Sequence, residues 1–260
     1  MPAQASTAPG EGADSKIPEA RPRARRGYKS VTLGRATSTG HGIPILLDGK
    51  AARTPARAVL ALPTRLLAEA VAAEWAAQSE YIDPATMPLT RLVNSAVDGV
   101  RGREAQVREE IANYAASDLL CYRASGPLPL VLRQAQLWDP ILAWGREAMG
   151  MSLLVAVGVM PVKQPAAARA ALARTLAAHD AFALAAMHVM TTLMGSALLA
   201  LAHAQGRLGL EEAWAAAHLD EDWQISQWGQ DAEAAARRQR QWIEMASASR
   251  LLSLLSAACR

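Results

Sequence analysis

Cysteine is scarce in this sequence. Of its 260 residues only Cys121 and Cys259 are cysteines, and they do not form a CxxC pair. A disulfide framework needs several cysteine pairs, and a Cys-rich zinc site needs closely spaced thiolates. Both are therefore excluded, and the composition fits a reducing compartment.

Motifs that carry catalysis are missing as well. The sequence has no GxxxxGK[ST] or GxGxxG phosphate loop, no HExxH zinc motif and no GxSxG nucleophile turn. Its histidines are isolated, since His179 and His188 lie nine residues apart. Cys121 lies in an apolar run, where a thiolate is not stabilised. These absences argue against an enzyme, so we expect no cofactor and no small-molecule substrate.

The folded part of the chain also lacks an excess of charge of either sign. Residues 1–29 contain six basic and three acidic groups, which account for the whole net charge of +3. The remaining residues carry 21 basic and 21 acidic groups, so they lack the basic surface that phosphate binding requires. We therefore expect no nucleic-acid partner. Residues 1–27, rich in Pro, Gly, Ala and Arg, are predicted to be a disordered tail.

One stretch, Ala183 to Ala202, has the length of a membrane span. Much of its apolar character comes from alanine, and it contains His188, Thr191, Thr192, Gly195 and Ser196. The stretch is therefore predicted to be a buried central helix, with no stable membrane insertion.

Strand signals are concentrated in the region after the tail, although Leu153 to Val159 is also β-leaning and is expected to be a strand or an extended link. Val31 and Leu33 alternate with polar neighbours, and Ile45 to Leu47 runs into Asp48-Gly49. An Asp-Gly pair after an apolar run is a strong hairpin signal, because a type I′ turn needs positive φ at both central residues. Ala58 to Leu62 reads as another short strand. A small sheet is predicted here.

Helical periodicity begins at Thr64, which can cap a helix whose buried stripe is Leu67, Val71 and Trp75. Further helices are predicted over 89–97, 103–124, 137–148, two between 166 and 203, 210–217, and a long final one over 220–257. The fold class is therefore α+β. The expected organisation is a disordered tail over 1–27, a β-rich N-terminal domain ending in a helix over 28–85, and a helical C-terminal domain over 86–260.

Asp118 stands out because it lies on the predicted apolar stripe of the helix over 103–124, between Tyr114 and Tyr122. Burying a charged carboxylate destabilises the fold by roughly several kcal/mol unless the carboxylate is paired and hydrogen-bonded. We therefore expect a partner such as Arg91 or Arg123, which would make Asp118 a structural anchor.

Acids and tryptophans gather between residues 220 and 233. The group comprises Asp220, Glu221, Asp222, Trp223, Trp228, Asp231 and Glu233. Three interpretations are open. Acids complement the positive end of a helix, so the segment could be a capped helix start. An acidic patch surrounded by Trp is also typical of a protein-binding surface. Clustered carboxylates can hold a divalent ion, which would suit a metal-dependent small-molecule hydrolase.

Short segments spread along the chain resemble the Atp12 family of F1-ATPase assembly chaperones. The matching segments are Leu47 to Lys50, Arg53 to Pro55, Leu62 to Thr64, Ala73 to Trp75, Met87 to Leu92, Ser117 to Ala124, Gln136 to Pro140, Leu219 to Gly229 and Asp231 to Glu233. None of them is a catalytic signature. Their number, order and spacing between about residues 28 and 240 make the resemblance specific.

The resemblance implies a chaperone that binds the unassembled α subunit of F1 and prevents its aggregation until the β subunit joins. It implies that Asp220 to Trp223 match the family's functionally sensitive region, with Glu221 foremost. We expect Trp228, Asp231 and Glu233 to belong to the same client-binding surface. Trp75, Asp118 and Trp138 are expected to be structural anchors. The implied compartment is the bacterial cytoplasm, or the mitochondrial matrix if the source is eukaryotic.

Overall fold

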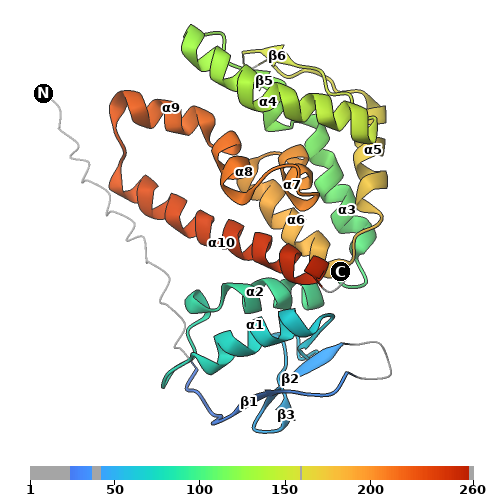
Figure 1. Ribbon diagram of the computed structural model, residues 1–260, viewed down its shortest axis with the longest axis vertical. Coiled ribbons are helices and arrows are strands. Elements are labelled where there is room, and N and C mark those ends of the chain that lie inside the picture. Colours follow the sequence, from blue (N-terminus) through green and yellow to red (C-terminus); the bar gives the residue numbers. More distant parts are fainter. Residues whose placement is uncertain (1–23, 37–41, 159, 258–260) are drawn as a thin grey trace, which may run out of the picture.

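The computed structural model describes residues 24–36, 42–158 and 160–257 (Figure 1). Of the expected tail over 1–27, residues 1–23 lie outside the described residues. Residues 24–26 run beside residues 80–82, where Ile82 N–H donates to Ala24 O and Arg26 N–H donates to Glu80 O, both at 2.8 Å.

A small antiparallel sheet forms one end of the molecule. Strand β2 (Ile43–Leu47) lies beside β1 (Val31–Leu33) and pairs with both β3 (Lys50–Ala51) and β4 (Ala61–Leu62). Asp48 and Gly49 join β2 to β3 with φ of 48° and 78°, the conformation that a type I′ turn requires. The predicted hairpin is therefore present.

Helix α1 (Arg65–Ala76) packs against this sheet. Thr64 Oγ1 accepts from Leu67 N–H at its start, as predicted, and Leu67 and Val71 are completely buried. Trp75, on the same stripe, is half-buried against Tyr28, whose hydroxyl donates to Trp75 O at 2.7 Å. The indole Nε1 of Trp75 is buried without a hydrogen-bond partner among the described residues.

Two carboxylates connect the sheet end to the helical bulk. Glu74 of α1 accepts from the backbone N–H groups of Leu89 and Thr90 at 2.9 and 2.7 Å, which caps α2 (Pro88–Ser95) from outside. A single π-helical turn, η2 (Ala96–Val100), follows. Its Asp98 accepts from Thr54 Oγ1 at 2.5 Å, in the loop after β3. A short 3-10 turn, η1 (Pro84–Thr86), leads into α2.

The larger part of the molecule is helical. Its helices are α3 (Glu104–Asn113), α4 (Leu128–Met149), α5 (Ala166–Leu176), α6 (Ala181–Met194), α7 (Ala197–Ala204), α8 (Leu210–Ala217), α9 (Leu219–Trp228) and α10 (Ala232–Ser256). Helix α6 is the buried centre, and α10 packs along it. Among the described helices, none combines the length and apolar character that a membrane crossing would need.

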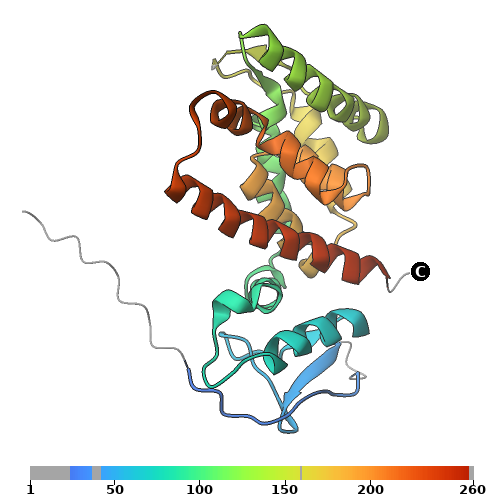
Figure 2. The same ribbon diagram turned by 60° about the vertical axis from the view of Figure 1, so that its left-hand side comes forward.

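Figures 1 and 2 show how the parts are arranged. The sheet and α1 lie at one end, and α4 lies at the other with the two-stranded parallel sheet of β5 (Tyr122–Arg123) and β6 (Ala156–Val157). Helix α10 runs between the two ends and reaches α1, where Thr64 Oγ1 donates to Leu254 O at 3.0 Å. The predicted α+β fold, with a small sheet first and a larger helical part after it, is confirmed.

Several predicted helices are wrong in extent. The helix predicted over 137–148 begins at Leu128, because Pro129 lies in its first turn, where proline is tolerated. The helix predicted over 103–124 ends at Asn113 and gives way to two 3-10 turns, η3 (Tyr114–Ala116) and η4 (Leu119–Cys121). Asp118 causes part of this, because its side chain accepts from Leu120 N–H and so starts η4. Between 166 and 203 there are three helices, since Gly195 adopts a left-handed conformation.

The long final helix predicted over 220–257 is also two helices. Gly229 has φ of 82° and ψ of 176°, a region of backbone space that is essentially restricted to glycine. Asp231 then caps α10, accepting from Ala234 N–H at 3.0 Å. The sequence therefore turns where the periodicity alone suggested continuity.

Candidate protein-binding site

The acids and tryptophans between 220 and 233 lie on a bent arm, which we define as α9, residues 229–231 and the first turn of α10. Figure 1 shows α9 running away from α8 and the chain turning back into α10. The arm thus presents two helix segments that meet at Gly229. The positions that sequence reasoning singled out are brought together along this arm, on both sides of the turn.

The three acids in the first turn of α9 each have an intramolecular partner. Asp220 accepts from Gln134 Nε2 of α4 at 2.7 Å. Asp222 pairs with Arg238 of α10 at 2.5 Å, and Glu221 lies 3.9 Å from the same guanidinium. Glu221 and Asp222 remain 38% and 45% exposed, so one face of each carboxylate is open to solvent.

The two tryptophans of the arm differ in burial. Trp223 is half-buried, and the guanidinium of Arg133 lies over its ring at 5.8 Å from the centroid. Trp228, at the end of α9, is 79% exposed, the most exposed large apolar side chain described. Asp231 and Glu233 are exposed at the start of α10. A solvent-exposed tryptophan ring beside carboxylates is a combination found at protein interfaces.

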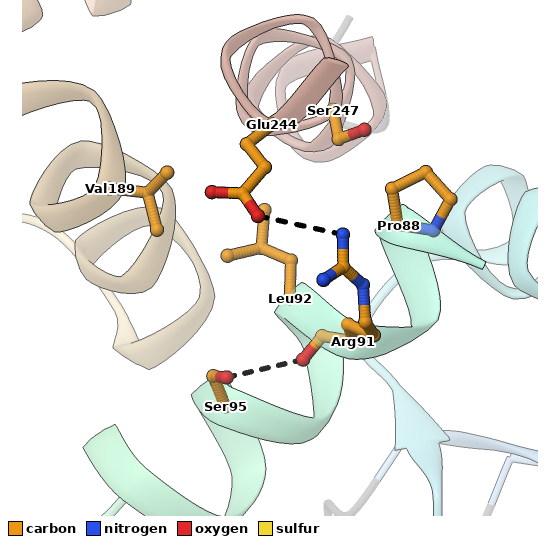
Figure 3. A pocket seen from close by; sticks show the side chains of 7 residues that line it. All are labelled: Pro88, Arg91, Leu92, Ser95, Val189, Glu244 and Ser247. Carbon is orange, nitrogen blue, oxygen red and sulfur yellow. Dashed lines mark hydrogen bonds and ion pairs between the residues drawn. The ribbon is translucent and has the colours of Figure 1, made fainter. Parts of the chain in front are cut away.

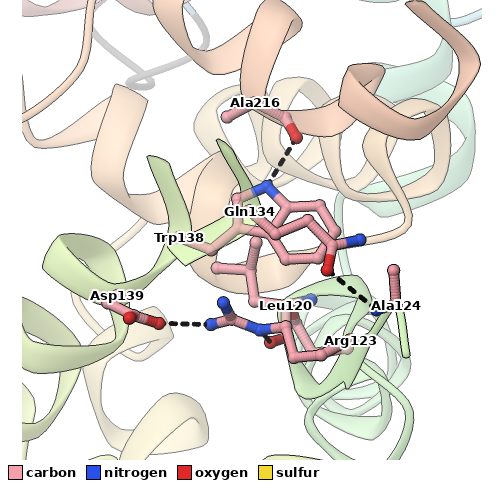
Figure 4. Close-up of polar contacts among 8 residues, drawn as sticks. Leu120, Arg123, Ala124, Gln134, Trp138, Asp139 and Ala216 are labelled. Atoms are coloured by element: carbon pink, nitrogen blue, oxygen red, sulfur yellow. Dashed lines mark hydrogen bonds and ion pairs between the residues drawn. The ribbon is translucent and has the colours of Figure 1, made fainter. Parts of the chain in front are cut away.

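A polar network beneath the arm fixes its position (Figure 4). Gln134 accepts from Ala124 N–H at 2.8 Å while its amide donates to Asp220, so it links the chain after β5 to α9. Trp138, one turn further along α4, is completely buried and donates from Nε1 to Ala216 O of α8 at 2.8 Å. Helix α4 thus holds the junction of α8 and α9 from two successive turns.

His218 lies at that junction. Its ring stacks on Trp214 at 3.8 Å, and its Nδ1 lies 2.9 Å from Trp214 O. Burial lowers the pKa of His218 below its usual range, and the nearby Arg238 lowers it further. The imidazole is therefore neutral at physiological pH and acts as part of the aromatic packing behind the acids.

Sequence reasoning missed the residues that position the arm. Gln134, Arg133 and Arg238 come from other elements, and a single sequence does not show which distant residues meet. One signal was available: Gln134 and Trp138 are four residues apart, so they lie on the same face of α4 and both point inward.

Asp118 is completely buried, as the sequence suggested, but the expected partner is wrong. Its carboxylate accepts from Leu120 N–H and from Leu198 N–H at the start of α7, both at 3.2 Å, and Ser196 adds a side-chain bond. Burial raises its pKa to about 6, and these hydrogen bonds oppose that rise. Backbone N–H groups at a helix start thus replace the arginine.

The two arginines proposed for Asp118 are engaged elsewhere. Arg123 donates to Asp139 of α4 at 2.7 Å and to Leu120 O at 3.1 Å (Figure 4). Arg91 of α2 pairs with Glu244 of α10 at 3.6 Å across the hollow between α2, α6 and α10 (Figure 3). Each therefore ties two elements together.

The carboxylates of the arm do not converge on one point. Within residues 24–36, 42–158 and 160–257, no three His, Cys, Asp or Glu side chains are grouped so that they could hold a metal ion. Burial, reinforced by the nearby Asp118, raises the pKa of the Cys121 thiol to about 12. That thiol is therefore protonated and a poor nucleophile.

Carboxylates and an exposed indole on a rigid support are compatible with binding another polypeptide. Comparison with known proteins gives the class of this protein, which is that of chaperones. The family model of the ATP12 chaperone protein matches residues 25–146. The chain belongs to the ATP12 chaperone family.

Two solved structures illustrate this kinship. A proposed chaperone from Agrobacterium tumefaciens is 49% identical, with a TM-score of 0.84, and the match covers 89% of this chain and 86% of that one. Atp12 from Paracoccus denitrificans is 38% identical, with a TM-score of 0.83, and the match covers 89% of this chain and 98% of that one. The likeness therefore extends well beyond the segment that the family model matches.

Proposed function

We propose that this protein is an assembly chaperone for the F1 sector of ATP synthase. In this proposal it binds the unassembled α subunit and prevents that subunit from aggregating until the β subunit joins. Membership of the ATP12 chaperone family supports the general role, and the sequence resemblance described above suggests the client. The protein works by covering a surface, with no bond made or broken.

The observation that carries the proposal is the bent arm. Trp228 exposes an indole that would gain burial in a complex, and aromatic side chains of this size contribute strongly to interfaces. Glu221 and Asp222 keep one open face each, so they can accept from donors on a client without first losing their own partner. The polar network that α4 forms beneath the arm holds these groups in place before binding, which reduces the entropy lost on association.

The first experiment is a direct binding test. The purified protein is mixed with purified, unassembled F1 α subunit, and light scattering follows aggregation of the α subunit at 37 °C. We expect suppression at a near-equimolar ratio, and release when β subunit is added. Unchanged aggregation would contradict the proposed client.

The second experiment tests the arm through Glu221→Lys. Charge reversal places a cation beside Arg238 and removes the open carboxylate, so we expect affinity for the α subunit to fall by about tenfold or more, equivalent to about 1.4 kcal/mol. The matched control is Glu69→Lys on α1, since Glu69 is 48% exposed and also has one arginine neighbour. Both variants should unfold near the wild-type temperature. Equal binding by the two would remove the arm from the mechanism.

A further inference from the structure

Exposed apolar side chains lie on and beside β6, the second strand of the parallel pair. Val157 of the strand is 67% exposed, Leu154 and Val155 just before it are 48% and 47% exposed, and Met160 after it is 74% exposed. Among the described residues, β6 pairs with one neighbouring strand, β5. A native protein usually protects such an edge with charges or a covering element.

The hydrogen-bond pattern shows which side of β6 is open. Gly158 N–H donates to Arg123 O at 2.7 Å, so alternate residues of β6 face β5. Because backbone groups alternate along a strand, the N–H and C=O of Val157 point to the opposite side. Among the described residues, no strand pairs with that side.

This edge is held in its extended form. The Gln164 amide pairs with both backbone groups of Leu154, accepting from its N–H and donating to its C=O at 2.8 Å each, as a neighbouring strand would. By the same alternation the backbone groups of Leu154 lie on the β5 side, and on that side Arg123 of β5 is fixed by Asp139 at 2.7 Å. A strand added to the open edge would therefore meet a preformed template.

A groove adjoins the edge. A hollow of about 400 Å³ lies between α4 and the stretch before β6, with Leu142, Leu153 and Val155 among its walls and Asp139 and Arg146 at its polar rim. It could take the side chains of an added strand. At the N-terminal end of α4, Leu128 and Leu132 are 68% and 59% exposed.

The open edge, the groove and the arm belong to one end of the molecule. Both ribbon views place β6 and α4 at the end opposite the four-stranded sheet, and Figure 1 shows α9 below α4 on the same half. Helix α4 touches the arm directly through Gln134 and Asp220. A client bound to the arm can therefore continue along α4 to β6.

We propose that an extended apolar segment of the unassembled α subunit adds to β6 as a third strand, with alternate side chains in the groove beside α4. This inference rests on the proposed function. A two-residue edge alone buries far less than the roughly 800 Å² per partner of a stable complex. The occupant must therefore be large enough to cover α4 and the arm as well, which favours the client over self-pairing of β6.

The test compares four variants, two expected to weaken binding and two controls, for binding to purified α subunit. Val155→Lys/Val157→Lys introduces edge charges that oppose strand addition. Val157→Pro removes the outward N–H without touching the bonds to β5, and Val157→Thr keeps that N–H and serves as its partner control. Val59→Lys is the control for charge, because Val59 is a 40% exposed valine at the opposite end.

We expect the double lysine variant and Val157→Pro each to weaken binding by about tenfold, because the lysines oppose strand addition by charge and proline removes an outward backbone donor. Val157→Thr and Val59→Lys should bind as the wild type does, and all four should melt near the wild-type temperature.

Binding of both weakened variants at wild-type strength would overturn the inference while leaving the proposed function intact. Wild-type protein that is dimeric, with variants that are monomeric and hold the α subunit normally, would overturn it in favour of self-pairing. Failure of the wild type itself to bind the α subunit would remove both proposals.

Discussion

Replacing Asp118 with asparagine should change how the stability of this protein depends on pH. The carboxylate is completely buried, and burial raises its pKa from 3.8 to about 6. A raised pKa in the folded state means that folding favours the protonated acid. Its contribution to stability is therefore fully present below about pH 3.8 and is lost as the pH rises through about 6.

The size of the effect follows from that shift. A difference of about two pKa units corresponds to about 3 kcal/mol across the full titration. Between pH 4.5 and 7.5 about 2 kcal/mol of it remains, because part of the loss has occurred by pH 4.5. Asparagine has a similar shape and does not titrate, although its NH₂ group faces N–H donors from Leu120 or Leu198.

The assay is urea denaturation of both proteins at pH 4.5 and pH 7.5, each analysed as a single transition. All other titrating groups are shared, so they cancel when the variant is compared with the wild type at each pH. The difference in the free energy of unfolding, Asp118→Asn minus wild type, should be about 2 kcal/mol higher at pH 7.5 than at pH 4.5, because only the wild type loses stability over that range. An equal difference at the two pH values would refute the raised pKa.

Three further substitutions test the fold around the arm. Trp138→Phe leaves Ala216 O without its donor and should lower the free energy of unfolding by about 1–3 kcal/mol in urea titrations. Gly229→Ala forces a side chain into the glycine-only turn and should cost about 1–3 kcal/mol, with faster amide hydrogen exchange in α9 as the readout. Gly145→Ala brings its new Cβ to 2.9 Å from Leu198 Cδ1 and should cost about 1–3 kcal/mol, with a lower melting temperature. Wild-type stability in any of the three would contradict the corresponding contact.

Local signals in the sequence account for much of the fold. Asp48-Gly49 predicts the turn of the sheet, and Thr64 predicts the start of α1, because both act on the backbone within a few residues of themselves. The apolar stretch Ala183 to Ala202 predicts one buried central helix. The stretch is buried at the centre, but Gly195 divides it between α6 and α7. The two failures near Asp118 and Gly229 share a cause. In each, one residue interrupts an apolar period that continues on both sides, and periodicity averages over such an interruption.

The candidate site was found by composition, and its architecture was not. Acids and tryptophans between 220 and 233 are visible in the sequence because they are contiguous. Their partners Gln134 and Arg238 are polar residues within other helices. Only the four-residue spacing of Gln134 from Trp138 distinguishes it from a solvent-facing residue, and Arg238 has no such signal. The exposed edge at Val157 was anticipated only as a β-leaning stretch, since exposure depends on which elements fail to cover it.

The position of Gln134 and Trp138 beneath the arm has a consequence for genetic screens. Both side chains are buried within α4, so neither offers atoms to a visiting polypeptide. Variants at these two sites would nevertheless be recovered among alleles that abolish holding, because they displace the helix carrying Glu221. In such a screen these alleles would resemble changes in client-binding residues. A measurement sensitive to tertiary packing, such as near-ultraviolet circular dichroism, would separate packing variants from contact variants.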